Sequence, residues 1–223
     1  VWCEPPPEEL QPLLQQCPRV ERVPPVLFVR PQDVEPSTAG RQALGVHEMD
    51  RVVLGIGSGD AVTERGQLDA LVAASRKPGL RFRVLFFAHY LPATESDGAS
   101  VVHVFPAGAW LRTCPVLVTS AGYHSYYEAM QANVPVVFRP LARPLDDQAR
   151  RARGDMGLVS IAPHAVATDD DALASAIHPL LVAELQRRHQ MRGLSEDVEM
   201  RGPAVGGAAV AANLVENIAR TAD

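Results

Sequence analysis

The feature that most constrains the fold is a regular alternation of short apolar runs with longer segments of helical spacing. The apolar runs occupy residues 51–56, 81–88, 101–105, 115–119, 134–138 and 157–161. Helical segments are expected at 64–76, 120–133, 146–153, 169–188 and 203–220. Strands that are apolar on both faces and alternate with helices imply a parallel sheet covered on both sides. The pattern predicts an α/β fold, a doubly wound parallel sheet of about six strands over residues 41–220.

The N-terminal part of the chain has a different composition, because prolines are crowded into residues 1–36. Each proline removes a backbone donor and fixes φ, so long regular structure is not expected there, apart from one short edge strand near VPPVLFV. We predict that residues 1–40 are a linker or the tail of a preceding domain. Residues 41–223 are then a single domain.

Composition limits the classes of partner and compartment. Hydrophobic residues make up 47% of the chain and charged residues 21%, as in ordinary globular proteins. The net charge of −5 and the lack of a Lys/Arg run argue against a nucleic-acid partner. Cys3, Cys17 and Cys114 have neither zinc-site nor disulfide-framework spacing, which favours a reducing, cytoplasmic compartment and no metal. Cys114 precedes an apolar run and is expected to be a buried free thiol.

Doubly wound sheets bind ligands at the carboxyl ends of their strands, so the loops after the apolar runs are the candidate sites. The first such loop contains Gly57, Ser58 and Gly59, where missing side chains let the backbone approach a ligand. The GK[ST] ending of a P-loop is missing. A plain turn in which Asp60 caps the next helix accounts for the same residues, and both interpretations stay open.

The second loop, TSAGYHSYYEA at residues 119–129, follows an apolar run and opens a helix. Free N–H groups at a helix N-terminus attract an anion such as a pyrophosphate, and Gly122 has no Cβ to block it. Glu128 follows His124 by four residues, and its carboxylate can accept hydrogen bonds from the vicinal hydroxyls of a ribose. Alternatively, Ser125 and Glu128 form a capping box. A ribose ligand predicts a partly exposed carboxylate that points into a cleft; a cap predicts one folded back toward Ser125.

The third loop ends in two aspartates and a glutamine ahead of a helix. Asp147 and Gln148 side by side can accept from and donate to several sugar hydroxyls. The alternative is that Asp146 is the N-cap and Asp147 lies in the first helical turn, where negative charge is favoured. That alternative leaves Gln148 unexplained.

In their order along residues 118–152, these features resemble the donor-binding signature of GT-B glycosyltransferases, which include the UDP-glycosyltransferases and the bacterial peptidoglycan N-acetylglucosaminyltransferase. The matching residues are Gly122, Ser125, Glu128, Ala129, Val134, Pro135, Pro140, Asp147, Gln148 and Ala152. RQALGV and GIGSGD are similar to the entry of the same domain. Two positions depart from the pattern: Asn133 replaces a Gly, and His124 stands where the plant-type enzymes have Asn.

The resemblance implies that residues 41–223 are the Rossmann-like, C-terminal domain that binds a nucleotide-sugar donor for transfer to an acceptor. It implies phosphate contacts from Gly57, Ser58, Gly59, Gly122, Tyr123, His124 and Ser125, a ribose contact from Glu128, and sugar contacts from Asp147 and Gln148. No metal or other cofactor is implied. The general base, most of the acceptor pocket and any peripheral membrane contact would belong to an N-terminal half. We expect that half to be missing here, so the isolated chain should transfer little.

Two other functions remain open. A nucleotide-sugar 2-epimerase shares the GT-B architecture, and Arg139-Pro140 followed by Arg143-Pro144 is similar to its Arg-x-x-x-x-Arg-Pro segment. Its Gly-Gly-x-x-Glu-Glu turn, however, does not match GYHSYYEA. The third possibility is a nucleotide-sugar-binding module without catalytic activity, because a fold alone does not specify chemistry.

Overall fold

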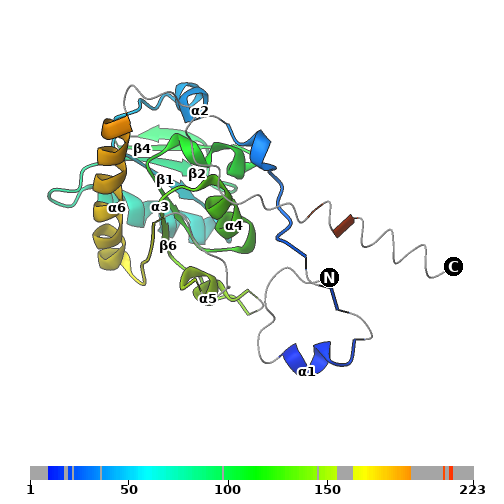
Figure 1. Cartoon of the computed structure of the whole chain (residues 1–223). Coiled ribbons are helices and arrows are strands. Elements are labelled where there is room, and N and C mark those ends of the chain that lie inside the picture. Colours follow the sequence, from blue (N-terminus) through cyan, green and yellow to red (C-terminus); the bar gives the residue numbers. More distant parts are fainter. Residues whose placement is uncertain are drawn as a thin grey trace.

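The structure is a computed structural model of the 223-residue chain. It describes residues 10–17, 20–21, 23–35, 37–96, 98–144, 146–154, 163–191, 208 and 211–212. Figure 1 shows one sheet at the centre of the molecule with helices on both of its faces.

The sheet consists of seven hydrogen-bonded strands in the order β3-β4-β2-β1-β5-β6-β7. Their bounds are β1 Val52–Ile56, β2 Arg83–Phe87, β3 Thr94–Ser96, β4 Ala99–Val102, β5 Val116–Thr119, β6 Val136–Phe138 and β7 His164–Val166. Every neighbouring pair is parallel except β3 and β4. β1 is buried along its whole length, as expected for a strand with a partner on each side and a helix layer on each face. The predicted doubly wound sheet is confirmed.

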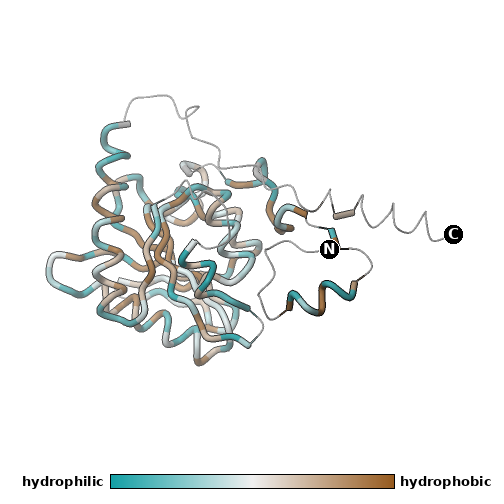
Figure 2. Tube along the Cα trace, turned by 60° about the horizontal axis from the view of Figure 1, so that its bottom comes forward, coloured by the Kyte–Doolittle hydropathy of each residue, from teal (hydrophilic) through white to brown (hydrophobic). Residues whose placement is uncertain are grey.

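Most of the helices cover the sheet in two layers, and the first one lies apart from it (Figure 1). Their bounds are α1 Gln11–Leu14, η2 Pro31–Asp33, α2 Ser37–Ala43, α3 Ala61–Ser75, η3 Ala107–Thr113, α4 Tyr123–Ala132, α5 Gln148–Ala152 and α6 Asp170–Met191. Leu71 of α3 and Ile177 of α6 pack on one face of the sheet with Phe86. Tyr127 of α4 packs on the opposite face with Phe138. Figure 2 shows the hydrophobic segments gathered in the interior between these layers.

Element boundaries follow the sequence pattern closely where the pattern is strong. Asn133 ends α4 in the left-handed conformation, at φ 53°, which Asn tolerates better than most residues. β3 was not predicted, because its three exposed residues carry no apolar signal. β7 was not predicted either, and the strand expected at 157–161 lies outside the described residues. So does most of the helix expected at 203–220, of which residues 208, 211 and 212 are described and helical.

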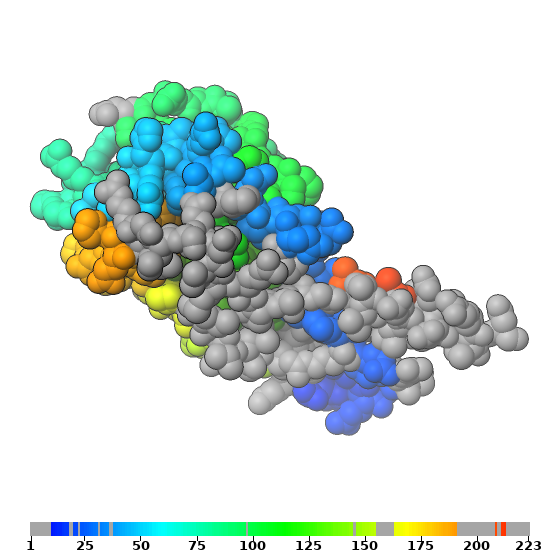
Figure 3. Space-filling model, turned by 45° about the horizontal axis from the view of Figure 1, so that its top comes forward, coloured from blue at the N-terminus to red at the C-terminus, as the bar shows by residue number. Residues whose placement is uncertain are grey.

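The proline-rich N-terminal part includes a segment, residues 23–35, that packs against the domain. The N–H group of Val26 donates to the hydroxyl of Tyr123 at 2.9 Å, and Gln131 Nε2 donates to the carbonyl of Val29 at 3.0 Å. The N–H group of Glu35 donates to the carbonyl of Ala109 at 2.7 Å. These bonds tie the segment to α4 and η3, and Figure 3 shows the blue N-terminal residues beside the green part of the surface.

Three expectations about the whole chain concern cysteines, membranes and metals. Cys114 is a buried free thiol, as predicted, and burial raises its pKa to about 11. Cys17 is free and exposed, while Cys3 lies outside the described residues. Within the described ranges, no helix has the length and apolar character needed to cross a bilayer. The same ranges contain no group of three or more His, Cys, Asp or Glu side chains placed to hold a metal ion.

Candidate functional site

A cleft of about 880 Å³ opens at the carboxyl ends of the parallel strands. This is the edge of a doubly wound sheet where ligands bind, and the volume suits a small organic molecule. The cleft is lined by residues from the loops after β1, β2, β4, β5 and β6 and by Phe28 of the N-terminal segment. The predicted site residues that line it are Gly57, Ser58, Gly59, Gly122, Tyr123, His124, Ser125, Glu128 and Gln148. Asp147 is not among the lining residues, whereas Asp146 is.

The loop after β1 is a tightly bonded turn. The N–H group of Ser58 donates to Gln67 Oε1 at 3.1 Å, and Gln67 Nε2 donates to the Ser58 hydroxyl at 2.9 Å. Asp60 caps α3 by accepting from the N–H group of Thr63 at 2.8 Å. This bond, together with the Thr63 side chain and the charge of Arg143, lowers the pKa of Asp60. The loop therefore caps a helix as the alternative interpretation expects, while Ser58 still faces the cleft.

Glu64, in the first turn of α3, joins two walls of the cleft and was missed from the sequence. Its side chain is fully buried, at 0% exposed. Its carboxylate accepts hydrogen bonds from the backbone N–H groups of His89, Tyr90 and Leu91 at 2.9, 2.9 and 3.2 Å. A Cβ on Gly57 would lie 2.5 Å from Glu64 Oε1, so only glycine leaves room for the carboxylate. Glu64 thus fixes the loop after β2 against the loop after β1.

The start of α4 faces the cleft without a side-chain cap. Gly122 is the N-cap and forms no side-chain capping bond, so the first N–H groups of the helix lack that partner. Ala121, just before it, has φ 63°, an uncommon conformation for a residue with a side chain. The Ser120 hydroxyl lines the cleft, is buried, and has no hydrogen-bond partner within the described part of the chain. A helix N-terminus without a side-chain cap, its dipole and a spare hydroxyl together favour an anionic ligand.

The capping-box interpretation of Ser125 and Glu128 is wrong. Ser125 is the third residue of α4 and not its N-cap, and its hydroxyl donates to the carbonyl of Gly122 at 3.3 Å. A capping-box serine must precede the first helical turn, so the S-x-x-E pattern here is coincidental.

Glu128 instead lies in the cleft wall against Gly108 of η3. A Cβ on Gly108 would lie 2.6 Å from Glu128 Cδ, so the carboxyl group occupies the space that the glycine leaves. The side chain is 7% exposed, less than expected for a ribose-binding residue in the absence of ligand. Within the described residues, no group hydrogen-bonds to this carboxyl, and burial alone raises its pKa to about 7. A buried acceptor without a partner is suited to hydroxyl donors from a ligand.

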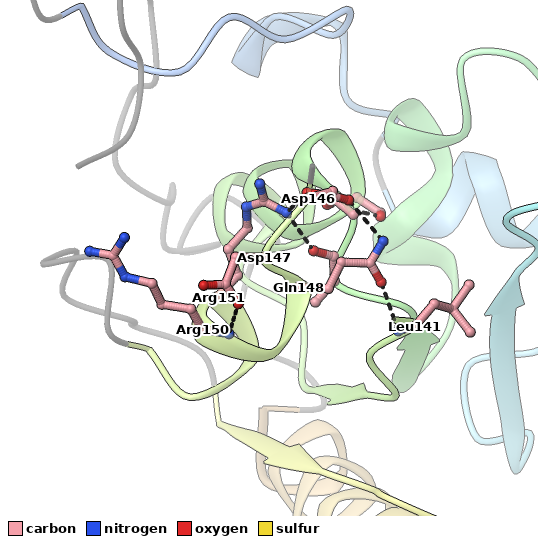
Figure 4. Close-up of polar contacts among 9 residues, drawn as sticks. Leu141, Asp146, Asp147, Gln148, Arg150 and Arg151 are labelled. Atoms are coloured by element: carbon pink, nitrogen blue, oxygen red, sulfur yellow. Dashed lines mark hydrogen bonds and ion pairs between the residues drawn. The ribbon is translucent and has the colours of Figure 1, made fainter. Parts of the chain in front are cut away.

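The loop after β6 is held by a network that Figure 4 shows. Gln148 Oε1 accepts from the N–H group of Leu141 at 2.9 Å, and Gln148 Nε2 donates to Asp146 at 2.8 Å. Asp146 forms an ion pair with the buried Arg151, which donates to the carbonyl of Ala121 at 3.2 Å. The network therefore connects this loop to the turn at the start of α4.

The cap of α5 corrects one expectation. Asp147, not Asp146, is the N-cap, and its carboxylate accepts from the N–H group of Arg150 at 3.0 Å (Figure 4). The helix starts one residue later than expected, which turns Asp146 toward Arg151 and Gln148 and places it on the cleft.

Aromatic rings form the outer rim of the cleft. Phe28 stacks on His124 with 4.5 Å between ring centroids, and Phe105 lies 5.9 Å from Phe28. Phe28 is 64% exposed and Phe105 78%, which is unusual for side chains of this size. Burial lowers the pKa of His124, which favours the neutral form of its ring. The sequence could not place Phe28 here, since it belongs to the part interpreted as a linker.

The chain was compared with protein families, curated sequences and solved structures. No family model matches it, and no curated protein sequence matches it. Solved structures do match. The glycotransferase of kitacinnamycin aligns with a TM-score of 0.50 and 21% identity, over 77% of this chain and 44% of its own. Spinosyn rhamnosyltransferase SpnG aligns with a TM-score of 0.48 and 18% identity, over 89% of this chain and 52% of its own. Glycosyltransferase SnogD from Streptomyces nogalater aligns with a TM-score of 0.46 and 21% identity, over 96% of this chain and 56% of its own.

These likenesses concern the fold. The chain spans about half the length of the solved glycosyltransferases that it matches. The mostly parallel sheet agrees with the Rossmann-like domain expected from the sequence. The chain shares its fold with GT-B glycosyltransferases, as the donor-binding signature in its sequence predicted.

Proposed function

We propose that this chain is the donor-binding domain of a glycosyltransferase and that its cleft binds a nucleoside-diphosphate sugar. The observation that carries the proposal is that one cleft holds two features suited to different parts of such a ligand. The start of α4 offers amide donors and a spare hydroxyl to an anion, and Glu128 offers a buried acceptor with no partner among the described residues. A nucleoside diphosphate supplies both an anion and vicinal hydroxyls.

Each wall of the cleft has a distinct role in this proposal. The diphosphate accepts hydrogen bonds from the first turn of α4 and from Ser120, and lies next to the turn at Ser58. Glu128 accepts from the ribose hydroxyls. The sugar lies near the loop after β6, where Gln148 and Asp146 line the cleft. Asp147 is engaged as a helix cap, so we assign it a smaller part in sugar recognition than Gln148.

The reaction we propose is transfer of the sugar from the diphosphate to a hydroxyl-bearing acceptor. The bond between the anomeric carbon and the diphosphate oxygen breaks, the acceptor oxygen bonds to that carbon, and a general base takes the acceptor proton. We place the base in the N-terminal half expected from the resemblance, not among the cleft residues described here. We further propose that the protein acts in the cytoplasm and without a metal ion, which activity in excess EDTA would test.

A thermal-shift screen with UDP, TDP and GDP and their sugars tests the proposed binding. A ligand that binds only the folded chain raises its stability by about 2.7 kcal/mol at a hundred times its Kd. A selective rise with one base supports the proposal and identifies the nucleotide, whereas no shift with any of them contradicts it. Product analysis of the longest available form of the protein then separates transfer, which yields a glycoside, from epimerisation, which alters the nucleotide sugar.

A further inference from the structure

The proposed ligand is an anion, but the contacts described so far supply no positively charged side chain to bind it. A diphosphate ester carries about two negative charges at pH 7, and sites that bind such groups supply cations or oriented donors. The described lining residues include two carboxyl groups, those of Glu128 and Asp146, and the chain as a whole has a net charge of −5. Asp146 is neutralised by Arg151. Arg143 is the only lysine or arginine among the described residues that line the cleft.

Arg143 lies directly over the glycine loop that follows β1. Its Nη2 atom is 2.6 Å from the position that a Cβ on Gly59 would occupy, so the guanidinium fills the space the glycine leaves. Gly59 has φ 97°, which disfavours any residue with a side chain at this position. The guanidinium also influences the loop electrostatically. The pKa of Asp60 is lowered chiefly by the N–H group of Thr63, and the charge of Arg143 adds to this effect.

No carboxylate of the described residues forms an ion pair with Arg143. Two other arginines of the region from β6 to α5 already have partners: Arg139 pairs with Asp170, and Arg151 pairs with Asp146. Arg143 is exposed, so its fork of N–H donors is open to solvent and to a ligand. A guanidinium binds phosphate oxygens in a bidentate manner and retains its charge at every physiological pH.

We propose that Arg143, from its position over Gly59, binds the diphosphate of the donor, so that the anion contacts both a guanidinium and the N-terminus of α4. This inference rests on the proposed function and adds a specificity-determining residue to it. It assigns Gly59 a role too, because a side chain there would displace the guanidinium. The Arg143 contact is made to the phosphates, so its contribution is independent of the base and the ribose.

The test compares diphosphates with nucleosides in three variants. Arg143→Ala removes the charge, and Arg143→Lys keeps the charge but loses the bidentate fork. The matched control is Arg76→Ala, which removes an exposed positive charge at the C-cap of α3, the end of that helix remote from the loop. Calorimetry with UDP and TDP, and ligand-observed NMR with uridine and thymidine, measure the affinities. Melting curves establish that each variant is folded.

For Arg143→Ala we expect about ten- to a hundred-fold weaker binding of UDP or TDP, with nucleoside affinity unchanged. Arg143→Lys should recover part of the loss, Arg76→Ala should bind as the unaltered chain does, and the salt dependence of UDP binding should decrease in Arg143→Ala. Undiminished UDP and TDP binding by Arg143→Ala overturns the inference and leaves the proposed function in place. If Arg143→Ala loses as much affinity for uridine as for UDP, the inference is also overturned and the proposed function stays in place. Failure of the unaltered chain to bind any diphosphate overturns the proposed function and this inference together.

Discussion

Two buried carboxyl groups have opposite surroundings: Glu64 lies behind the loops that line the cleft, and Glu128 lines the cleft itself. Each glutamate belongs to the helix that follows a parallel strand, Glu64 to α3 and Glu128 to α4. Each also faces a glycine on which a Cβ would collide with it: the distance would be 2.5 Å from Gly57 to Glu64 and 2.6 Å from Gly108 to Glu128. Glu64 accepts three backbone hydrogen bonds. Glu128 has none from the described residues.

The difference separates a structural carboxylate from one available for binding. A buried charge is costly unless hydrogen bonds replace its lost hydration. Glu64 obtains those bonds from the protein, and it fixes two loops in return. Glu128 obtains none from the described residues, and burial raises its pKa to about 7. The count of internal partners therefore indicates which of the two carboxyl groups is available to a ligand.

The largest expected effect is on stability, from Glu64→Ala. Hydrogen bonds to charged groups contribute about 1.5–3 kcal/mol each but are not additive, so we expect the free energy of unfolding to fall by about 3–5 kcal/mol. Urea denaturation measures the change. Glu64→Gln keeps one acceptor oxygen and should lose less. A loss of under about 1 kcal/mol in Glu64→Ala would show that the bonds to His89, Tyr90 and Leu91 contribute little.

Next in size is the binding effect of Glu128→Gln. Replacing one partner of a charged hydrogen bond to a ligand costs about 1.5–3 kcal/mol, so the Kd of UDP or TDP should rise about ten- to a hundred-fold. Calorimetry measures it, with the nucleoside as a second ligand, since the ribose is common to both. Unchanged affinity for both ligands would remove Glu128 from the proposed site.

The same variant should affect stability in a pH-dependent manner. The pKa of Glu128 is about 7 in the folded chain against an ordinary value of 4.5, so its contribution to stability is present below pH 4.5 and lost as pH rises through 7. The glutamine side chain of the variant does not titrate and avoids that loss. We expect Glu128→Gln to match the unaltered chain at about pH 4 and to exceed it by about 1–3 kcal/mol at about pH 8. Equal stability at both pH values would contradict the raised pKa.

The smallest effects come from the two glycines. Gly57→Ala pushes against a carboxylate held by three bonds and should cost about 1–3 kcal/mol of stability. Gly108→Ala meets the free end of Glu128, which can move, so stability should change by only about 0.5 kcal/mol. The displaced carboxyl should still weaken UDP binding several-fold. Equal destabilisation by both substitutions, measured by thermal melts, would mean that Glu128 is held as firmly as Glu64.

The sequence predicted the sheet and most of its helices, because uniformly apolar strands and the Asn133 stop signal act locally. It also placed residues 57–59 and 122–128 at strand ends, which the fold brings together. The role of Glu64 could not be predicted, since its partners lie 25 to 27 residues away and are backbone groups without a sequence signature. The cap of α5 was wrong by one residue, which is the usual precision of helix boundaries. That single position decided whether Asp146 or Asp147 lines the cleft.

The N-terminal segment has a practical consequence for protein engineering. Proline-rich stretches are attractive junctions for exchanging domains between related proteins, because few contacts usually cross such linkers. Here a crossover at residue 37 would separate Phe28 from His124 and would break the bonds of Val26 and Val29 to α4. The resulting chimera would have a cleft that lacks Phe28 at its rim. A junction placed before residue 23 keeps the rim and its helix together as one exchangeable part.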